Sequence, residues 1–273
     1  MKIIEWNINQ RLNYSKKDMP EWIADVIKQR QADIVILTEF FQGNNWGEIK
    51  KKSFGDAYYF LTSNNFQGGN NDVAIAIKKE NLEVIYSKSF LSVNHNVADH
   101  LEVKCKTKDN KEFLVVGMRI HASASHDEKL EEMMLVMDSV RDEKVVIIGG
   151  DFNNNRRGFN APEGWHLEKL DEILSDKFKR YTPRGSSIFS ENPFNSNSDY
   201  EFASDHFLIK GIDDDKIFLK DYNRDFTEKD KQVYKWGRDF NIYLGKDEKG
   251  KNKYDSVNPP YPDHAILIAE VKI

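Results

Sequence analysis

The sequence predicts an α/β fold in which two mixed β-sheets pack against each other and helices lie outside them. Segments with strand patterns outnumber segments with helical patterns along the 273 residues. A hairpin pattern around Asp109-Asn110 occurs beside β-α-β stretches, which indicates sheets with both parallel and antiparallel neighbours. Polar candidate residues lie near both ends of the chain, so we expect a single domain over residues 1–273.

The expected elements follow from the spacing of apolar residues, which alternate or run together in strands and recur every three to four residues in helices. Pro20 suits the first turn of a helix. The expected apolar face of the second helix consists of Leu130, Met133, Met134 and Met137. We expect strands over 2–8, 33–37, 72–77, 82–90, 100–107, 112–121, 145–148, 202–210 and 265–271, and helices over 20–31 and 127–141.

Composition and charge limit the classes of function. An aromatic share of 12% argues against disorder, and a net charge of -5 is unlike that of proteins that coat nucleic acid nonspecifically. No apolar run approaches the roughly 18 residues that a membrane span needs, and Lys2 and Glu5 interrupt the start of the chain where a signal peptide is apolar. We therefore expect a cytoplasmic protein with no membrane contact and no obligate protein partner. Cys105 is the one cysteine, and we expect a buried thiol.

One motif joins a strand to polar ligands. Gly149-Gly150-Asp151-Phe152-Asn153 directly follows the apolar run 145–148. We expect a buried strand that runs into a tight glycine turn. Because residues i and i+2 of an extended segment point the same way, Asp151 and Asn153 are expected to face one cleft. Such a pair suits a phosphate oxygen and a hard metal ion better than an apolar core.

Further polar residues recur where other expected strands begin or end. One such residue means little, whereas an ordered set is hard to obtain by chance in an ordinary core. Hydrolysis of a phosphate ester explains these residue types, because it needs a cation, a base and hydrogen-bond donors for phosphate oxygens. The set consists of Asn7 and Asn9 after Trp6, Glu39, Arg119 and His121, Asp205, and Asp263-His264.

For the cation, Glu39 is the strongest ligand candidate, helped by Asn7, because Mg²⁺ prefers carboxylate and carboxamide oxygens. For the base we choose His264 with Asp205 as its partner. A carboxylate fixes the tautomer of such a histidine and stabilises the imidazolium that forms. In Asp205-His206 only Asp205 is assigned a function, since His206 is expected on the other face of its strand.

For the donors, Asn153, His121 and Arg119 are the candidates for charge that develops on the phosphate. Asp151 either aligns the attacking water or holds a cation. Arg119 either contacts phosphate or pairs with an acid. Arg156, in the loop after the glycine motif, either grips a second phosphate or sugar-phosphate or lies in solvent.

The order of these motifs resembles the endonuclease/exonuclease/phosphatase superfamily, the deoxyribonuclease-I-like fold. The resemblance covers nearly the whole chain and is specific in the combination of the Gly-Asp-Phe-Asn element with the closing Asp-His. It depends on Trp6-Asn7-Ile8-Asn9, Thr38-Glu39, Ile120-His121, Gly150-Asp151-Phe152-Asn153, Ser204-Asp205-His206 and Asp263-His264.

The resemblance implies a four-layer αββα sandwich and cleavage of phosphate esters that depends on a divalent metal, Mg²⁺ or in its place Mn²⁺. It implies a metal at Glu39 and Asn7, with Asp263 a further ligand candidate. It also implies that His264 is the catalytic histidine. Two departures are noted. Asn9 stands where some members carry an aspartate, and the closing motif reads Tyr261-Pro262-Asp263-His264 rather than Ser-Asp-His.

We therefore expect a Mg²⁺-dependent phosphoesterase in which water attacks the phosphorus directly. A nuclease or phosphodiesterase is placed slightly ahead of a phosphomonoesterase that acts on a small metabolite such as a sugar phosphate. A non-catalytic binding module of the same fold is the alternative from another class. Residues 211–262 are expected to be an insertion that forms a substrate wall or a solvated excursion.

Overall fold

A computed structural model describes the chain at residues 1–8, 19, 21–63, 72–90, 100–122, 124–154, 165–174, 177–184, 187, 203–223, 241–246, 248–249, 252–256 and 264–273. Its body consists of two six-stranded β-sheets. In the first sheet β1 and β2 are parallel and the other neighbours are antiparallel. The order of this sheet is β11 (Ile217–Leu219), β14 (Leu267–Val271), β1 (Lys2–Asn7), β2 (Ile34–Phe40), β4 (Asp72–Lys78) and β3 (Tyr58–Thr62).

The second sheet is mixed in the same way. Its β7 and β8 are parallel, while its other neighbours are antiparallel. The prediction of two mixed sheets is therefore confirmed. The order of this sheet is β5 (Leu82–Phe90), β6 (His100–Thr107), β7 (Glu112–Arg119), β8 (Val146–Asp151), β10 (Asp205–Lys210) and β9 (Phe178–Tyr181).

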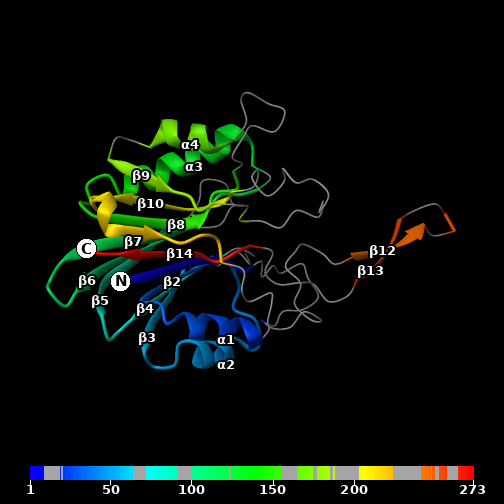
Figure 1. Ribbon diagram of the computed structural model, residues 1–273, viewed down its shortest axis with the longest axis horizontal. Coiled ribbons are helices and arrows are strands. Elements are labelled where there is room, and N and C mark those ends of the chain that lie inside the picture. The colour runs from blue at the N-terminus through cyan, green and yellow to red at the C-terminus, as the bar shows by residue number, and fades with distance from the viewer. Residues whose placement is uncertain are drawn as a thin grey trace.

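Three apolar cores separate four layers. One core lies between the two sheets, a second lies between the first sheet and α1 (Glu21–Arg30) with α2 (Trp46–Ser53), and a third lies between the second sheet and α3 (His126–Ser139) with α4 (Leu167–Ile173). Figure 1 shows the two helix pairs on opposite outer faces of the paired sheets. The fold is thus the αββα sandwich that the sequence predicted.

The alternation of residues along β1 shows how the layers form. Ile3 joins the core between the sheets, while Ile4 and Trp6 join the core beneath α1 and α2. Glu5 is therefore on the same face of β1 as Ile3, between the sheets. Cys105 also lies in the core between the sheets, and burial raises the pKa of its thiol to about 12, which agrees with the expected buried thiol.

Helix α3 begins at a capping box. The Ser125 side chain accepts a hydrogen bond from the Glu128 backbone N–H, and the Glu128 carboxylate accepts one from the Ser125 N–H. The expected apolar face of this helix was wrong in one respect, because Met134 is 45% exposed. Instead, Lys129 is buried beside the apolar residues, since it lies on the face that carries Met133 one turn later.

Short elements absent from the sequence prediction are α2, α4, β3, β9 and β11 to β13. Each is brief and has few apolar residues of its own, so tertiary pairing decides its conformation. The segment 211–262 contributes β11 to the first sheet, after the 3-10 turn η2 (Asp214–Lys216). It also contains β12 (Asn241–Lys246) and β13 (Asn252–Ser256), which form a separate two-stranded sheet. In the described part of the chain, no helix combines the length and the apolar character needed to cross a membrane.

The glycines of the Gly-Asp-Phe-Asn motif lie inside β8, so the expected glycine turn was wrong. Gly149 and Gly150 pair with β7 in parallel register, and the chain turns only after Asp151. A Cβ atom at Gly150 would lie 1.9 Å from the Met118 carbonyl oxygen. The glycine is needed because two backbones approach each other closely there, one residue before Asp151.

We expect Gly150→Ala to destabilise the protein by about 1–3 kcal/mol or more, because the Met118 carbonyl is backbone and cannot swing away. Urea unfolding monitored by circular dichroism measures this change. Gly47→Ala in α2 is the matched control, since a Cβ atom there meets nothing within 4 Å. Equal stability of the two variants would contradict the packing argument.

Candidate active site

The strand ends bring polar side chains from both sheets to one edge of the sandwich. β1 and β2 end at this edge in the first sheet, as do β7 and β8 in the second. β10 starts there, opposite the end of β8. The side chains that these elements carry to the edge are Asn7, Glu39, Arg119, Asp151 and Asp205, and His264 precedes β14 beside them.

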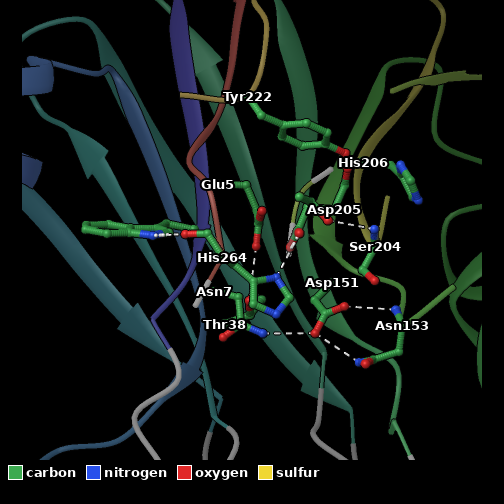
Figure 2. Close-up of polar contacts among 12 residues, drawn as sticks. Glu5, Asn7, Thr38, Asp151, Asn153, Ser204, Asp205, His206, Tyr222 and His264 are labelled. Carbon is green, nitrogen blue, oxygen red and sulfur yellow. Dashed lines mark hydrogen bonds and ion pairs between the residues drawn. The ribbon is translucent and has the colours of Figure 1, made fainter. Parts of the chain in front are cut away.

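A histidine and a carboxylate form a buried pair at this edge. The Nδ1 atom of His264 lies 2.8 Å from Oδ2 of Asp205, and both side chains are almost fully buried. Figure 2 shows the imidazole facing the Asp205 carboxylate. Burial raises the pKa of Asp205, His264 opposes this effect, and Asp151 adds to it. The pair therefore joins a proton-accepting ring to a carboxylate that fixes its orientation.

Backbone contacts hold both members of this pair. The Trp6 indole N–H donates to the His264 carbonyl at 3.1 Å, and the Tyr222 hydroxyl donates to the Asp205 carbonyl at 2.6 Å. Ser187 links the two segments, because its side chain accepts from the Ser204 N–H and its carbonyl accepts from the Ala265 N–H. The pair is thus positioned by residues from distant parts of the chain.

Amide groups surround the Asp151 carboxylate. Oδ2 accepts hydrogen bonds from the Asn7 and Asn153 side-chain amides, each at 2.9 Å, and Oδ1 accepts one from the Asn153 backbone N–H at 2.9 Å. Figure 2 shows both amides directed at this carboxylate. Because Nδ2 of Asn153 also donates to the Ile120 carbonyl, both of its protons are used inside the protein. Asn7 and Asn153 therefore fix the orientation of Asp151.

The turn that carries Asn153 has an uncommon backbone conformation. Asn153 has φ of 46°, in the left-handed region that few residues other than glycine adopt. Side chains from outside the turn bind its carbonyl groups. Lys129 donates to the Asn153 carbonyl, Trp165 to the Phe152 carbonyl and Ser204 to the Asn154 carbonyl. The surrounding structure thus imposes this conformation, as is common at functional sites.

Glu39 has the same backbone feature in the other sheet. Its φ is 49°, and the pairing of β2 with β4 shifts register between Leu37 and Phe40. Such a bulge redirects a side chain at the end of a strand. Glu39 is 1% exposed, and its Oε1 lies 2.6 Å from Nη2 of Arg119. The first sheet therefore presents a carboxylate to the second sheet through a strained residue.

Arg119 places a guanidinium between two carboxylates. Besides the contact with Glu39, its Nε lies 3.7 Å from Oδ2 of Asp151. The side chain is only 4% exposed, and Nε and Nη1 have no hydrogen-bond partner within the described part of the chain. A buried guanidinium with unused donors is suited to bind an anion.

Glu5 is a buried carboxyl group that sequence analysis did not identify. Its Oε1 accepts a hydrogen bond from the Thr38 hydroxyl at 3.0 Å, and the side chain has no exposed surface. Burial raises the pKa of Glu5 well above its ordinary value, and the nearby charges of Asp205 and Asp151 add to this effect. Its alternation with Asn7 on β1 is the sequence signal that could have placed it at the site.

Two further cationic or polar groups lie near the Asp151 turn. Lys129 is buried, and burial lowers the pKa of its amine while Asp151 opposes this effect. Burial also lowers the pKa of His121, and the positive charges of Arg119 and Lys129 lower it further. Lys129 was absent from the sequence prediction, although its position one turn before Met133 indicates the buried face of α3.

Some expected residues lie elsewhere or are not described. His206 is fully buried on the far side of β10, where its ring nitrogens contact Thr182 at 3.0 Å and Asn154 at 2.8 Å. It points away from His264 in Figure 2, as expected for the other face of the strand. Asn9, Arg156 and Asp263 lie outside the described residues.

The donor set fits a hard divalent cation. The four buried carboxyl groups of the site face the positive charges of Arg119 and Lys129, which leaves excess negative charge when all four are ionised. Atoms of Asp151, Asp205 and His264 lie within 4.8 Å of one another, close enough to hold an ion. The four carboxyl groups are Glu5, Glu39, Asp151 and Asp205. Oxygen donors of this kind suit Mg²⁺ or Mn²⁺.

The chain belongs to the Endonuclease/Exonuclease/phosphatase family. The model of that family matches residues 4–206, which include Asn7, Glu39, Asp151 and Asp205 but end before His264. Members of this family hydrolyse phosphate esters, which supports a hydrolase. No curated protein matches the sequence.

Solved structures share the whole fold. Caenorhabditis elegans TDP2 matches with a TM-score of 0.65 and 15% identity over 100% of this chain and 97% of that chain. D. rerio TDP2 complexed with a single strand DNA product matches with a TM-score of 0.64 and 12% identity over 100% and 99%. The mannosyl-6-phosphatase Bt3783 of Bacteroides thetaiotaomicron VPI-5482 matches with a TM-score of 0.63 and 17% identity over 100% of both chains. At these identities the likeness establishes the fold alone.

We expect Glu5→Gln to stabilise the metal-free protein at about pH 8 but not at about pH 4.5. The raised pKa of Glu5 means that the native state holds this proton more tightly than the unfolded chain does. The stability that this proton contributes is complete below the unfolded pKa of about 4.3 and is lost as the pH rises through the native pKa. Glutamine keeps the acceptor for Thr38 and cannot ionise.

Thermal unfolding in EDTA at the two pH values measures this effect. Each kcal/mol corresponds to about 2–4 °C for a domain of this size. Glu48→Gln, at an exposed position in α2, is the control. A loss of stability in Glu5→Gln that is the same at both pH values would show that Glu5 is not protonated in the native state.

Proposed function

We propose that this protein is a divalent-cation-dependent phosphoesterase in which an activated water attacks phosphorus directly. The observation that carries the proposal is the buried contact between His264 and Asp205 beside the amide-bound Asp151. Membership of the Endonuclease/Exonuclease/phosphatase family supports the reaction class.

In this proposal His264 is the general base. Its Nδ1 keeps the proton that bonds to Asp205, so Nε2 is the nitrogen that takes a proton from water. Asp205 stabilises the imidazolium that results. Asp151, oriented by Asn7 and Asn153, aligns the attacking water. The new P–O bond forms as the ester P–O bond breaks, and no covalent intermediate with the protein is involved.

Glu39 and Asn7 are proposed to hold the cation, with Asp263 as a further ligand. A bound divalent cation supplies charge that neutralises phosphate oxygens and stabilises the leaving oxygen. The Asp151, Asp205 and His264 group fits an ion less well, because its oxygens and Nδ1 already take part in internal hydrogen bonds. These bonds suit proton transfer instead.

Arg119 is proposed to bind the substrate phosphate, because its Nε and Nη1 are buried donors without partners in the described residues. His121 is placed to help it, and Arg156 is the candidate for a second phosphate. Asn153 reaches a phosphate oxygen only by exchanging one of its present hydrogen bonds, so its first role in this proposal is to orient Asp151.

A phosphodiester is proposed as the substrate, as in a nuclease or phosphodiesterase, and the structural likeness to the TDP2 complex with a DNA product supports this choice. A phosphomonoester of a small metabolite is the second candidate. The net charge of -5 and the likeness to a mannosyl-6-phosphatase favour it. Rates on mono- and bis-nitrophenyl phosphate with Mg²⁺ or Mn²⁺ distinguish the two. Absence of turnover on both esters with either metal would instead favour a non-catalytic binding module.

We expect His264→Ala to lower kcat on the preferred nitrophenyl ester by about 10²–10⁴-fold, because the general base is lost. Asp205→Asn should lower kcat as well, since the ring then loses the carboxylate that holds its tautomer. His166→Gln, a histidine at the start of α4, is the control. A near-normal rate for His264→Ala in a folded protein would refute the assigned base.

We expect Glu39→Gln to weaken binding of Mg²⁺ by about tenfold or more, because a carboxylate ligand becomes a neutral amide. Isothermal titration of the metal-free protein measures the affinity without reference to turnover. Glu48→Gln serves again as the exposed control. An unchanged titration would remove Glu39 from the ligand set.

A further inference from the structure

Arg119 occupies the position that a bridging second cation would need. Phosphoester hydrolases with two metals hold them about 3.5–4 Å apart between shared carboxylates. In this protein Glu39 and Asp151 are the carboxylates that face each other from the two sheets. The Arg119 guanidinium lies between them, 2.6 Å from Glu39 Oε1 and 3.7 Å from Asp151 Oδ2.

The guanidinium is a permanent part of this position. It is 4% exposed and carries its charge at any pH in the physiological range. A divalent cation beside it would meet strong repulsion, because charges interact more strongly in a buried environment than in water. Lys129 adds a second positive charge on the side of Asp151. The space between the sheets therefore already holds the positive charge that its carboxylates require.

The other group that could take an additional ion is internally bonded. His264 Nδ1 contacts Asp205 Oδ2 at 2.8 Å, and Asp151 accepts hydrogen bonds through both of its oxygens. An ion held by these three residues would have to break the contact that orients His264. Neither place between the sheets is thus suited to a second cation while Arg119 is present.

We propose that Arg119 takes the place of a second metal, so that the site binds one divalent cation. The guanidinium neutralises the Glu39 and Asp151 carboxylates on one side and offers Nε and Nη1 to the substrate phosphate on the other. This inference deepens the proposed function and depends on it for the identity of the substrate group. It concerns cation number, which is measured without turnover.

The test is the stoichiometry of Mn²⁺ binding to the metal-free full-length protein, by isothermal titration and by electron paramagnetic resonance of free Mn²⁺. The wild type should bind one Mn²⁺. Arg119→Met, which keeps much of the side-chain length without charge, should bind two. Arg119→Lys, which keeps the charge, should bind one. Circular dichroism and thermal unfolding establish that each variant is folded.

Two bound Mn²⁺ in the wild type, or none, would overturn the inference whether or not the variants fold. A folded Arg119→Met protein that binds one Mn²⁺ would overturn it as well, because Arg119 would then not be what excludes the second cation. Hydrolysis of nitrophenyl esters is measured separately. A wild type that binds one Mn²⁺ and hydrolyses neither ester would refute the proposed function and leave the assignment of Arg119 standing.

Discussion

Burial of several carboxyl groups between two apolar sheets is the constraint on which the rest of the site depends. Charged groups removed from water are tolerated only when they are paired or hydrogen-bonded. Here Arg119 pairs with Glu39 across the sheets, amides bind Asp151, and His264 contacts Asp205. Glu5 meets the same constraint differently, because its raised pKa favours the neutral form. The polar centre is therefore one coupled network rather than a set of separate residues.

The backbone is adapted to this network at two places. Glu39 and Asn153 both adopt positive φ, and one follows a strand of each sheet. Strain of this kind persists only where neighbouring contacts impose it. At Asn153 the contacts come from Lys129 and from the bonds to Asp151 and Ile120. The two strained residues thus aim side chains from opposite sheets at a common centre.

Much of the architecture could be predicted because long apolar segments carry a clear period. The strands of 2–8, 33–37 and 145–148 and both long helices were found with small errors at their ends. Short elements such as β9 and α4 carry too little signal, and their pairing partners decide them. Gly150 was misplaced in a turn for a related reason. Its role depends on the Met118 carbonyl in the neighbouring strand, which local sequence does not reveal.

The order of polar motifs along the chain is enough to indicate the family and to single out Asp151, Asp205 and His264, because each follows or precedes a recognisable strand. Which atoms meet is a matter of the packed sheets. Contacts such as His264 with Asp205 join residues 59 positions apart, and Asn7 reaches Asp151 across 144 positions. The burial of Glu5 and the place of Arg119 between two carboxylates likewise exist only after both sheets have closed, since neither residue has a local partner that would mark it.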